Sequence, residues 1–431
     1  MSDIKKILDN AKKRMIEKGA DKGQIFVTES EAREFNVESG EFTLLRTVFT
    51  SDINIIVYKA QRKGEYYTNR IDDEAVNNGV DMAVTSTESG EYDEAYDIAP
   101  YQGNVQADKG VYEPDTDMLF TRTKELIDDI TKNHPKIVIN RLIVSHNRRH
   151  MVFGNTNGTF CDEYIGSYGI SLGIAAHEGD KSTSLRNSFA VTDNLDKPFI
   201  ELGNIRNHIL ITESQLAAEP MEGKFTGTMV VMPDCIGMFI SPLSNFVSDY
   251  SILNGTSIWL NKLGEQVADS RVTIKIDPCD KRIICGETLS FDGFKSEPYF
   301  LIKEGRLESF MINQYTSKKT GYKQAKNGSF SVVMDRGDRS VNDIIGSIDR
   351  GIIVGGFSGG QPGINGDFSG VAKNSFLIEN GMITRPVTEV MINGNIADMF
   401  MNIEGISEET VCDGYDVLPY MAFNGIIVSG K

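Results

Sequence analysis

The spacing of apolar residues changes character within the first hundred positions. Apolar residues from Ile4 to Ile16 fall on one face at helical spacing, which predicts a surface helix over residues 3–18 that stops at Gly19. Apolar and polar residues then alternate, which predicts short strands with turns at Ser39-Gly40 and Lys63-Gly64. The expected strands are QIFVTES, AREFNVES, EFTLLRTVF, INIIVYKA and EYYTNRI. A second helix is expected from about Asp72, which can cap it, to Ala83.

The same plan recurs after a polar connection. Residues 86–113 are acidic and rich in turn formers, which indicates a long connection between domains. A helix over residues 118–132 should follow, then strands with a hairpin turn at Asn157-Gly158, and a helix from about Phe199. The expected strands are KIVINRLIVSH, HMVFGN, TFCDEYIG, YGISLGIAAHE and TSLRNSFAV. Helix, strands and helix thus occur twice, and an internal duplication is one interpretation.

A third pattern begins after Pro220. Residues 233–250 and the segment SIWLNKLGEQVA, residues 257–268, both have the spacing of helices, and strands should dominate from RVTIKI onward. FLIKEGRL and FLIENGMI are near copies, and each predicts a hairpin whose turn glycine, Gly305 or Gly381, has a positive φ. The C-terminal part is therefore expected to be rich in β-structure.

Together these elements predict an α+β fold in a chain of 431 residues, which is long enough for two or three domains. We expect an N-terminal α/β domain with an acidic linker over residues 1–105 and a middle strand-rich α/β domain over residues 106–222, both built from mixed helices and antiparallel strands. A large β-rich C-terminal domain should occupy residues 223–431.

Charge and cysteine usage narrow the class of protein. The formal net charge of -17, without a basic stripe, argues against direct nucleic-acid binding. The five cysteines form no C-x-x-C pair, so neither a disulfide framework nor a zinc ribbon is indicated. The charged amphipathic N-terminus and the lack of a long apolar run argue against export and membrane spanning. A cytoplasmic protein with reduced thiols is expected.

The glycine-rich stretch GGFSGGQPGINGDFSG, residues 355–370, could be taken for a catalytic loop. A phosphate loop would need a lysine and a hydroxyl where Gln361-Pro362 stands. Ser358 lies in a G-x-S-x-G pattern, but a nucleophile elbow must enter a helix and needs a later histidine, whereas the last histidine is His208. The pattern therefore predicts turns and close backbone approaches rather than chemistry.

The histidines do not form a metal site by spacing. His146 and His150 lie in a strand pattern, about 13 Å apart, beside two arginines. His177-Glu178 begins like H-E-x-x-H but has no second histidine, and His134 and His208 are isolated. No three nitrogen or sulfur ligands assemble with the spacing of a zinc site.

The segment GDFSGVAKNSFLIENGMITRPVTEVMINGNIADMF, residues 366–400, resembles the most recognisable motif of the TldD/PmbA family. Members of this family were first named for modulation of DNA gyrase. NGTSIWLNKLGEQVADSRVTIKIDP and FLIKEGRLESFMINQYTSKKTG follow the family's order and spacing, and weaker similarity extends over nearly the whole chain. The resemblance implies a cytoplasmic protein that acts in proteolysis of unfolded peptides, in precursor-peptide maturation and antitoxin degradation. It also implies two kinds of subunit that pair around a cavity.

The resemblance further identifies the chain as the type of subunit without a metal. TldD-type chains carry His-Glu-x-x-x-His on a helix and a later cysteine ligand, whereas PmbA-type chains, also called TldE, lack the motif. In this chain the resemblance places Ser241, Pro242 and Phe246 at the motif positions and aligns Cys412 with the cysteine. Serine is a poor zinc ligand, and proline and phenylalanine offer neither a ligand nor a general base.

These residues predict a noncatalytic PmbA/TldE-type subunit with no catalytic residue, metal or cofactor of its own. The zinc is expected in a TldD-type partner subunit, and the substrate is an unfolded peptide held by backbone hydrogen bonds. Peptide or interface contacts are expected on the helix with Ser241 and Phe246 and in the segment made of Asn365, Gly366, Asp367, Phe368 and Ser369.

Two alternatives remain open at this point. The chain could be a metallopeptidase with an unrecognised site, for example Cys412 with His177, or a homodimeric peptide-binding protein without a peptidase partner. Neither membrane nor nucleic acid is expected as a partner.

Overall fold

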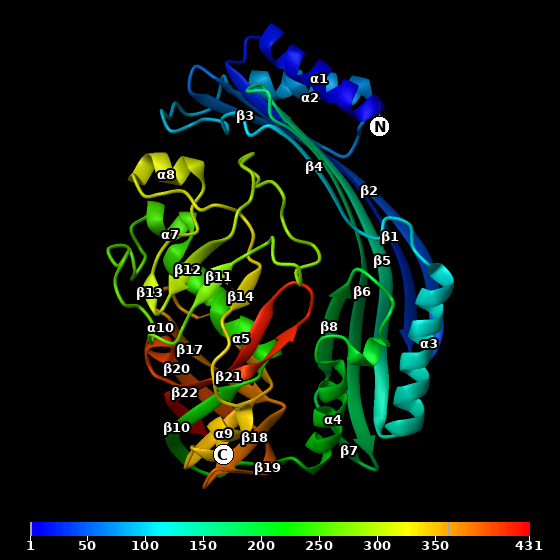
Figure 1. Cartoon of the computed structure of the whole chain (residues 1–431), viewed down its shortest axis with the longest axis vertical. Helices are drawn as coiled ribbons and strands as arrows, with labels where there is room; N and C mark the ends of the chain where they lie inside the picture. Colours follow the sequence, from blue (N-terminus) through cyan, green and yellow to red (C-terminus); the bar gives the residue numbers. More distant parts are fainter. Residues whose placement is uncertain (1, 361) are drawn as a thin grey trace.

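Two β-sheets organise the chain in the computed structural model, which describes residues 2–360 and 362–431. Gln361, which enters the argument against a phosphate loop, lies outside the described residues. In Figure 1 a long, curved sheet built from the first half of the chain arches beside a body built from the second half. The mixture of helices with largely antiparallel strands confirms the predicted α+β class.

The N-terminal sheet has eight strands, in the order β3-β2-β1-β5-β6-β4, with β7 and β8 also paired to β6. Its helices and strands are α1 (Ser2–Glu17), β1 (Lys22–Glu38), β2 (Glu41–Lys59), β3 (Arg62–Thr68), α2 (Asp73–Ser86), β4 (Asn104–Gly110), α3 (Thr116–Asn133), β5 (Ile137–Asn155), β6 (Phe160–Glu178), β7 (Lys181–Ser182), β8 (Arg186–Thr192) and α4 (Ile205–Ser214), with short 3₁₀ turns at Phe199–Glu201 and Gln215–Ala217. The sheet takes strands from both sides of the expected boundary between residues 105 and 106.

The suspected duplication corresponds to a repeated topology. We call α1, β1, β2, β3 and α2 the first repeat and α3, β5, β6, β8 and α4 the second repeat. The strands of the two repeats have lengths of 17, 19 and 7 residues against 19, 19 and 7. β1 and β5 pair antiparallel at the centre of the sheet, from Gln24 opposite Asn155 to Val37 opposite Leu142. Each repeat packs its helices on its own apolar core.

The strands are longer than the sequence pattern predicts. β1 and β2 each merge two expected strands, and the turn at Ser39-Gly40 is where it was expected. The predicted turn at Lys63-Gly64 is wrong, because Ala60 and Gln61 take the positive φ values, 50° and 56°. Gly64 is required for another reason, since a Cβ atom there would lie 1.9 Å from the Ala83 carbonyl oxygen.

The C-terminal body contains a fourteen-stranded sheet whose main path is β13-β12-β11-β14-β22-β10-β15-β18-β19-β9. Its strands are β9 (Glu219–Pro220), β10 (Lys224–Val231), β11 (Ile274–Ile276), β12 (Tyr299–Lys303), β13 (Arg306–Leu307), β14 (Val332–Met334), β15 (Arg350–Val354), β16 (Gly356–Gly359), β17 (Asp367–Lys373), β18 (Ser375–Glu379), β19 (Met382–Thr388), β20 (Val390–Asn395), β21 (Ile403–Cys412) and β22 (Val417–Ser429). Its helices are α5 (Pro233–Ile240), α6 (Ser244–Val247), α7 (Asp249–Leu253), α8 (Gln314–Thr320), α9 (Val341–Gly346) and α10 (Ile396–Met401), and the 3₁₀ turn Ser241–Leu243 joins α5 to α6.

Two details of this body test the sequence patterns. Both near-copied segments form hairpins, and Gly305 and Gly381 have φ values of 77° and 74°, as predicted. The helix predicted over residues 257–268 is absent from that described segment. Its backbone bonds instead to the first hairpin: Gly264 N donates to Leu307 O, and Val267 N donates to Gly305 O. Nonlocal pairing has therefore overridden the helical spacing.

The sheet and the body meet at several places, among them contacts made by β1, β4 and β8. At one end the segment after α2 docks on α8, where Asp93 accepts hydrogen bonds from Tyr315 Oη at 2.7 Å and Lys319 Nζ at 3.0 Å. At the other end Arg186 of β8 is buried and donates to the Gly355 carbonyl at 3.2 Å. Within residues 2–360 and 362–431, no helix combines the length and the apolar character needed to cross a membrane.

Candidate functional site

The helix predicted over residues 233–250 is a series of short helical segments rather than one helix. Pro233 stands in the first turn of α5, where a missing N–H is tolerated, and α5 ends at Ile240. Pro242 follows in the 3₁₀ turn, where a continuous α-helix would need its backbone N–H. The prediction of a single helix was wrong at this proline, and the chain bends through α6 into α7.

The three positions that align with the metal motif lie on this bent segment. Ser241 is exposed, whereas Pro242 and Phe246 are buried. The Phe246 ring has no exposed surface and lies 4.9 Å, centroid to centroid, from Trp259 in the core of the body. A buried phenyl ring and a proline provide no ligand atom, so these residues do not fit a zinc ion.

The glycine-rich stretch folds back over the same segment. β16 and β17 form an antiparallel hairpin, and Phe357 and Phe368 on these strands each lie 5.4 Å from the Phe239 ring of α5. A Cβ atom on Gly366 would lie 3.0 Å from Cζ of Phe246, and the φ of Gly366 is 90°, so glycine is required there. The structure thus brings together the two segments that sequence analysis selected.

Within the predicted contact segment, alternate residues point in opposite directions. Gly366 and Phe368 are buried, whereas Asn365, Asp367 and Ser369 are exposed. Asn365 Nδ2 donates to Asp367 Oδ2 at 2.6 Å, and Asn395 Nδ2 donates to Asp367 Oδ1 at 2.8 Å. These hydrogen bonds fix the loop against the start of α10, so the side chains of Asn365 and Asp367 already have partners.

The edge whose backbone groups could pair with an additional strand belongs to β16 rather than to β17. β17 lies between β16 and β20, so both of its edges are paired. β16 pairs only with β17 among the described residues, and Ser358 and Gly359 are exposed. An extended peptide could add to this edge by main-chain hydrogen bonds.

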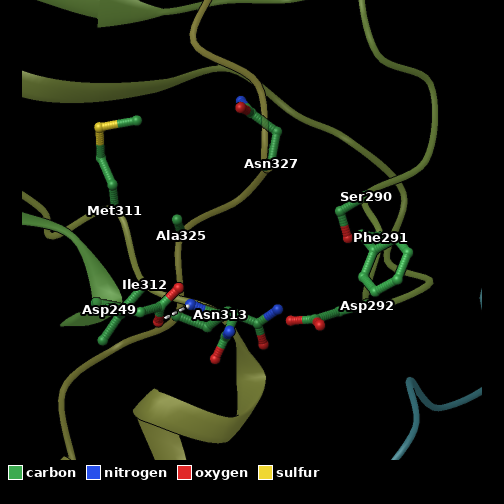
Figure 2. Close-up of a pocket in the computed structure, with 11 residues that line it drawn as sticks. Asp249, Ser290, Phe291, Asp292, Met311, Ile312, Asn313, Ala325 and Asn327 are labelled. Carbon is green, nitrogen blue, oxygen red and sulfur yellow. Dashed lines mark hydrogen bonds between the residues drawn. The ribbon is translucent and has the colours of Figure 1, made fainter. Parts of the chain in front are cut away.

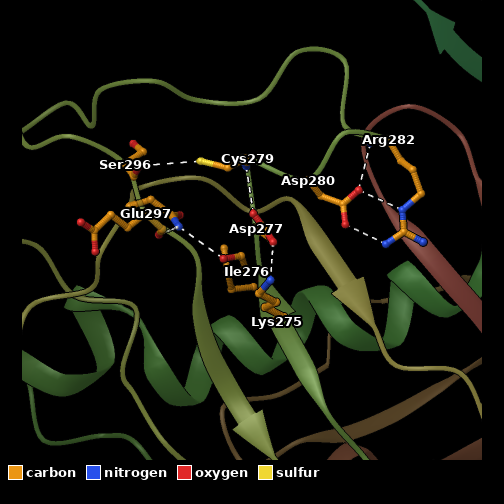
Figure 3. A network of polar contacts seen from close by, with 9 residues as sticks. Lys275, Ile276, Asp277, Cys279, Asp280, Arg282, Ser296 and Glu297 are labelled. Carbon is orange, nitrogen blue, oxygen red and sulfur yellow. Dashed lines mark hydrogen bonds and ion pairs between the residues drawn. The ribbon is translucent and has the colours of Figure 1, made fainter. Parts of the chain in front are cut away.

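Cys412 lies at a different place, at the end of β21. Its thiol contacts the Arg282 carbonyl oxygen at 3.5 Å, and burial raises its pKa. Figure 3 shows the neighbouring network, in which Arg282 donates to Asp280 and Cys279 Sγ approaches the Ser296 carbonyl. The Arg282 guanidinium lowers the pKa of Asp280 to about 2, so this carboxylate is committed to its ion pair.

A cavity of about 240 Å³ lies at the far end of the bent segment (Figure 2). Asp249 and Asp292 face it, but Asp249 accepts a hydrogen bond from Asn313 N at 2.9 Å and Asp292 accepts one from Gln314 N at 2.8 Å. Burial raises the pKa of Asp292. Across residues 2–360 and 362–431, no group of three or more His, Cys, Asp or Glu side chains could hold a metal ion.

Sequence analysis missed a buried polar cluster at the junction of the two sheets. His208, expected to be isolated, lies between Ser188 and Asp234: its Nδ1 is 2.5 Å from Ser188 Oγ, and its Nε2 is 2.9 Å from Asp234 Oδ2. Ser188 and His208 are each only 2% exposed, so a substrate has no access to the serine. The sequence contained one signal of this cluster, because Asp234 is a charged residue among the apolar residues of α5. The cluster joins β8 and α4 to α5.

Comparison with known proteins agrees with this architecture. Residues 222–430 match the family model of the PmbA/TldA metallopeptidase C-terminal domain. A metalloprotease of Methanothermobacter thermautotrophicus is 29% identical over 216 residues, which is 45% of each chain. A metalloprotease PmbA homolog of Haemophilus influenzae is 22% identical over 379 residues, covering 84% of this chain and 82% of the relative. The match thus spans less than half of the first relative and most of the second.

Solved structures share the whole fold. TldE from Thermococcus kodakarensis superposes with a TM-score of 0.84 at 20% identity and covers 98% of this chain and 100% of its own. A Bacteroides thetaiotaomicron protein described as a "putative modulator of DNA gyrase" superposes with a TM-score of 0.87 at 22% identity, over 99% of both chains. At these identities the likeness establishes the fold alone. The family match over residues 222–430 and the curated relatives assign this chain to the TldD/PmbA family.

Proposed function

We propose that this chain is the noncatalytic, PmbA/TldE-type subunit of a cytoplasmic metallopeptidase complex that cleaves unfolded peptides. The observation that carries the proposal is the burial of Phe246 in the hydrophobic core, at a position where TldD-type chains are expected to carry a histidine. A ring packed against Trp259 beneath Gly366 cannot be replaced by a metal ligand without rebuilding the core. The metal and the activated water would come from a TldD-type partner subunit.

In this proposal the chain contributes peptide binding. The exposed edge of β16 offers backbone donors and acceptors that tolerate any side chain, which suits an unfolded substrate. Gly360, just after β16, leaves room for a second backbone to approach, because a Cβ atom there would meet nothing within 4 Å. Asn365 and Asp367 hold the loop that follows β16, because Asn395 binds both residues.

The first test combines purified chain with a TldD-type chain and an unfolded peptide. We expect a mixed complex on size-exclusion chromatography and faster cleavage than by the TldD-type chain alone. If no complex elutes and cleavage is unchanged, the proposal is wrong. A stoichiometric metal in this chain alone, removed by chelators together with peptidase activity, would also contradict it.

The second test addresses binding through the strand edge. A peptide N-methylated at alternate residues cannot donate main-chain hydrogen bonds along one edge, so we expect its affinity to fall at least tenfold. The matched control is a peptide N-methylated in the other phase, whose free N–H groups still face β16. Equal affinity of both peptides and the unmodified one would exclude binding through this edge.

A further inference from the structure

A cleft of about 400 Å³ lies between the N-terminal sheet and the C-terminal body. Residues 180–184 around the β7 turn and residues of the turn at 215–218 form one wall, and residues 371–374 and 387–388 at the ends of β17 and β19 form the other. The volume is that of a site for a small molecule. Because the two walls belong to different halves of the chain, a ligand held between them would join the halves.

Two lysines line this cleft from opposite walls. Lys181 is exposed in the hairpin and Lys373 is half-buried on β17, and neither forms an ion pair in the part of the chain that the structure describes. Glu178, which lies opposite Lys181 in the β7 hairpin, binds Lys136 at 2.7 Å instead. Among the described lining residues Asp180 is the one acidic group. Two lysines without acidic partners are unexpected in a chain where acidic residues outnumber basic ones by 61 to 44.

Neutral polar groups surround the two lysines. Ser184, Asn374 and Thr388 line the cleft, and their side chains form no hydrogen bond with any other described residue. Hydroxyl and amide groups can donate hydrogen bonds, and an ammonium group can only donate them. The lining is therefore rich in donors, which is the composition that binds an anion.

A third cation lies behind the wall that belongs to the body. Arg186 is 4% exposed, and its Nε has no hydrogen-bond partner among the described residues. A Cβ atom on Gly355 would lie 3.0 Å from Nη1 of Arg186 and 2.9 Å from the carbonyl oxygen of Asn374, so the guanidinium and this part of the wall are near neighbours. Asp234, which attracts Arg186, also accepts a hydrogen bond from His208 at 2.9 Å. The guanidinium therefore adds positive charge next to the cleft.

We infer that this cleft binds an oxyanion, the phosphate or carboxylate group of a small ligand, between Lys181 and Lys373. Lysine binds such groups as a point charge through charge-assisted hydrogen bonds. Lys373 lies on the face of β17 opposite Phe368, and Phe368 contacts Phe239 of α5, so the site is separate from the bent segment that begins with α5. The inference does not rest on the proposed function, because it requires neither a TldD-type subunit nor an unfolded peptide.

The first test measures the melting temperature of the full chain in sodium chloride, phosphate and acetate at equal ionic strength. It compares the wild type with a variant that carries Lys181→Gln and Lys373→Gln. General salt effects act on both proteins, so the difference between their shifts reports binding in the cleft. We expect phosphate, acetate or both to raise the melting temperature of the wild type saturably, by about 2 °C more than that of the variant.

The matched control carries Lys197→Gln and Lys224→Gln, which removes two exposed lysines that line no part of the cleft. We expect it to respond to the anions as the wild type does. A response to phosphate alone assigns the cleft to phosphate groups, and a response to acetate alone assigns it to carboxylates. Equal shifts of the wild type and the Lys181→Gln/Lys373→Gln variant in all three salts overturn the inference.

Hydrogen exchange of the wild-type chain tests the site without any substitution. In the presence of the anion, exchange should slow in both walls, over residues 180–184 and 371–374, because a bridging ligand restrains both. α1 is the internal reference, since it lies at the opposite end of the molecule from β7 (Figure 1) and should be unaffected. Slowing that is confined to one wall, or that is equal in α1, contradicts an anion held between the two lysines.

Discussion

The two repeats of the N-terminal sheet share a topology but differ in how they are held. The second repeat is covered on its edge by β4, β7 and β8 and is joined to the C-terminal body through buried groups, with Ser188, His208 and Asp234 in contact. Among the described residues, the first repeat has an open edge at residues 41–50. It also contacts the body, because buried Gln24 of β1 donates to the Phe291 carbonyl at 3.1 Å and, in the segment after α2, Asp93 pairs with Lys319 and Asp97 with Lys318. The two repeats thus differ most clearly in that one has a covered edge and the other an open edge.

The largest expected effect comes from removing the buried histidine of the second repeat. His208→Ala leaves the Asp234 carboxylate without its main partner and opens a cavity, so we expect a loss of about 3–4 kcal/mol of unfolding free energy. Urea denaturation of the full chain measures it. Lys319→Ala is the control at the other junction, where an exposed pair should cost at most about 1 kcal/mol. Equal losses of unfolding free energy in the two variants would mean that the two junctions contribute equally to stability.

The pairing of β4 with the outer edge of β6 in the second repeat depends on a close contact between two backbone segments. A Cβ atom on Gly166 of β6 would lie 1.8 Å from the Val111 carbonyl oxygen, just beyond β4. Gly166→Ala should therefore displace β4, at a cost of about 2–3 kcal/mol, and increase hydrogen exchange over residues 104–110. Gly169→Ala is the control in the same strand, because its nearest neighbour is a side-chain atom, Ser145 Oγ at 3.2 Å. If protection of β4 from hydrogen exchange is unchanged in Gly166→Ala, the pairing of β4 with β6 does not need this contact.

The sequence predicted the repeated plan because alternation and helix caps are local signals. Ser39-Gly40, Gly305 and Gly381 were located correctly, since a positive φ selects particular residues. The helix at residues 257–268 and the turn at Lys63-Gly64 were wrong, because partners distant in sequence decided them. The role of residues 104–110 as the cover of β6 was likewise hidden within an acidic connection.

The candidate site shows the same limit. The composition of Ser241, Pro242 and Phe246 argued against a metal ligand set, but only the fold shows Phe246 in the core under Gly366. The contact of His208 with Asp234 joins residues 26 positions apart in different elements, and the charge of Asp234 among the apolar residues of α5 does not identify its partner. Sequence analysis selected two segments that the fold brings together, and tertiary packing determined which of their atoms are exposed.

Acid should destabilise the second repeat more than the first, because all five histidines lie between residues 134 and 208. Burial lowers the pKa of His208 and of His146 below the ordinary value of 6.5. The unfolded chain therefore binds more protons as the pH falls below about 6.5, and stability present above that pH is lost on acidification. The loss is at most about 1.4 kcal/mol per histidine per pH unit.

Hydrogen exchange at pH 7 and pH 5.5, corrected for intrinsic rates, checks this prediction. From pH 7 to pH 5.5 we expect protection from exchange to fall over residues 116–214 and to stay unchanged over the first repeat, residues 2–86. His146→Gln should reduce the pH dependence, since the substituted side chain cannot protonate and can still donate to the Val111 carbonyl that His146 contacts at 2.6 Å. A larger loss of protection in the first repeat would contradict the assignment.

The smallest effects should come from two arginines on the first helix of each repeat. Arg14 of α1 forms an ion pair with Asp81 of α2, in which both side chains are about one-third exposed, so Arg14→Ala should cost about 0.5–1 kcal/mol. Arg122 of α3 is 16% exposed and donates to the carbonyls of Leu195 and Asp196 at 2.9 Å. Arg122→Ala should cost about 1–2 kcal/mol, because it leaves the carbonyl of the buried Leu195 unpaired.

The dependence on salt distinguishes the interactions of the two arginines better than the size of the loss in unfolding free energy does. At 1 M sodium chloride the Debye length is about 3 Å, so the cost of Arg14→Ala should shrink to the part due to its one backbone hydrogen bond, to the Asn77 carbonyl at 3.1 Å. The cost of Arg122→Ala should shrink less, because only its pair with Glu125 is screened and its two hydrogen bonds to backbone carbonyls are not. Parallel urea titrations at low and high salt measure both. If the two costs respond equally to salt, then α1 and α3 are held by the same kind of interaction, and the difference between the repeats is confined to their edges and their contacts with the C-terminal body.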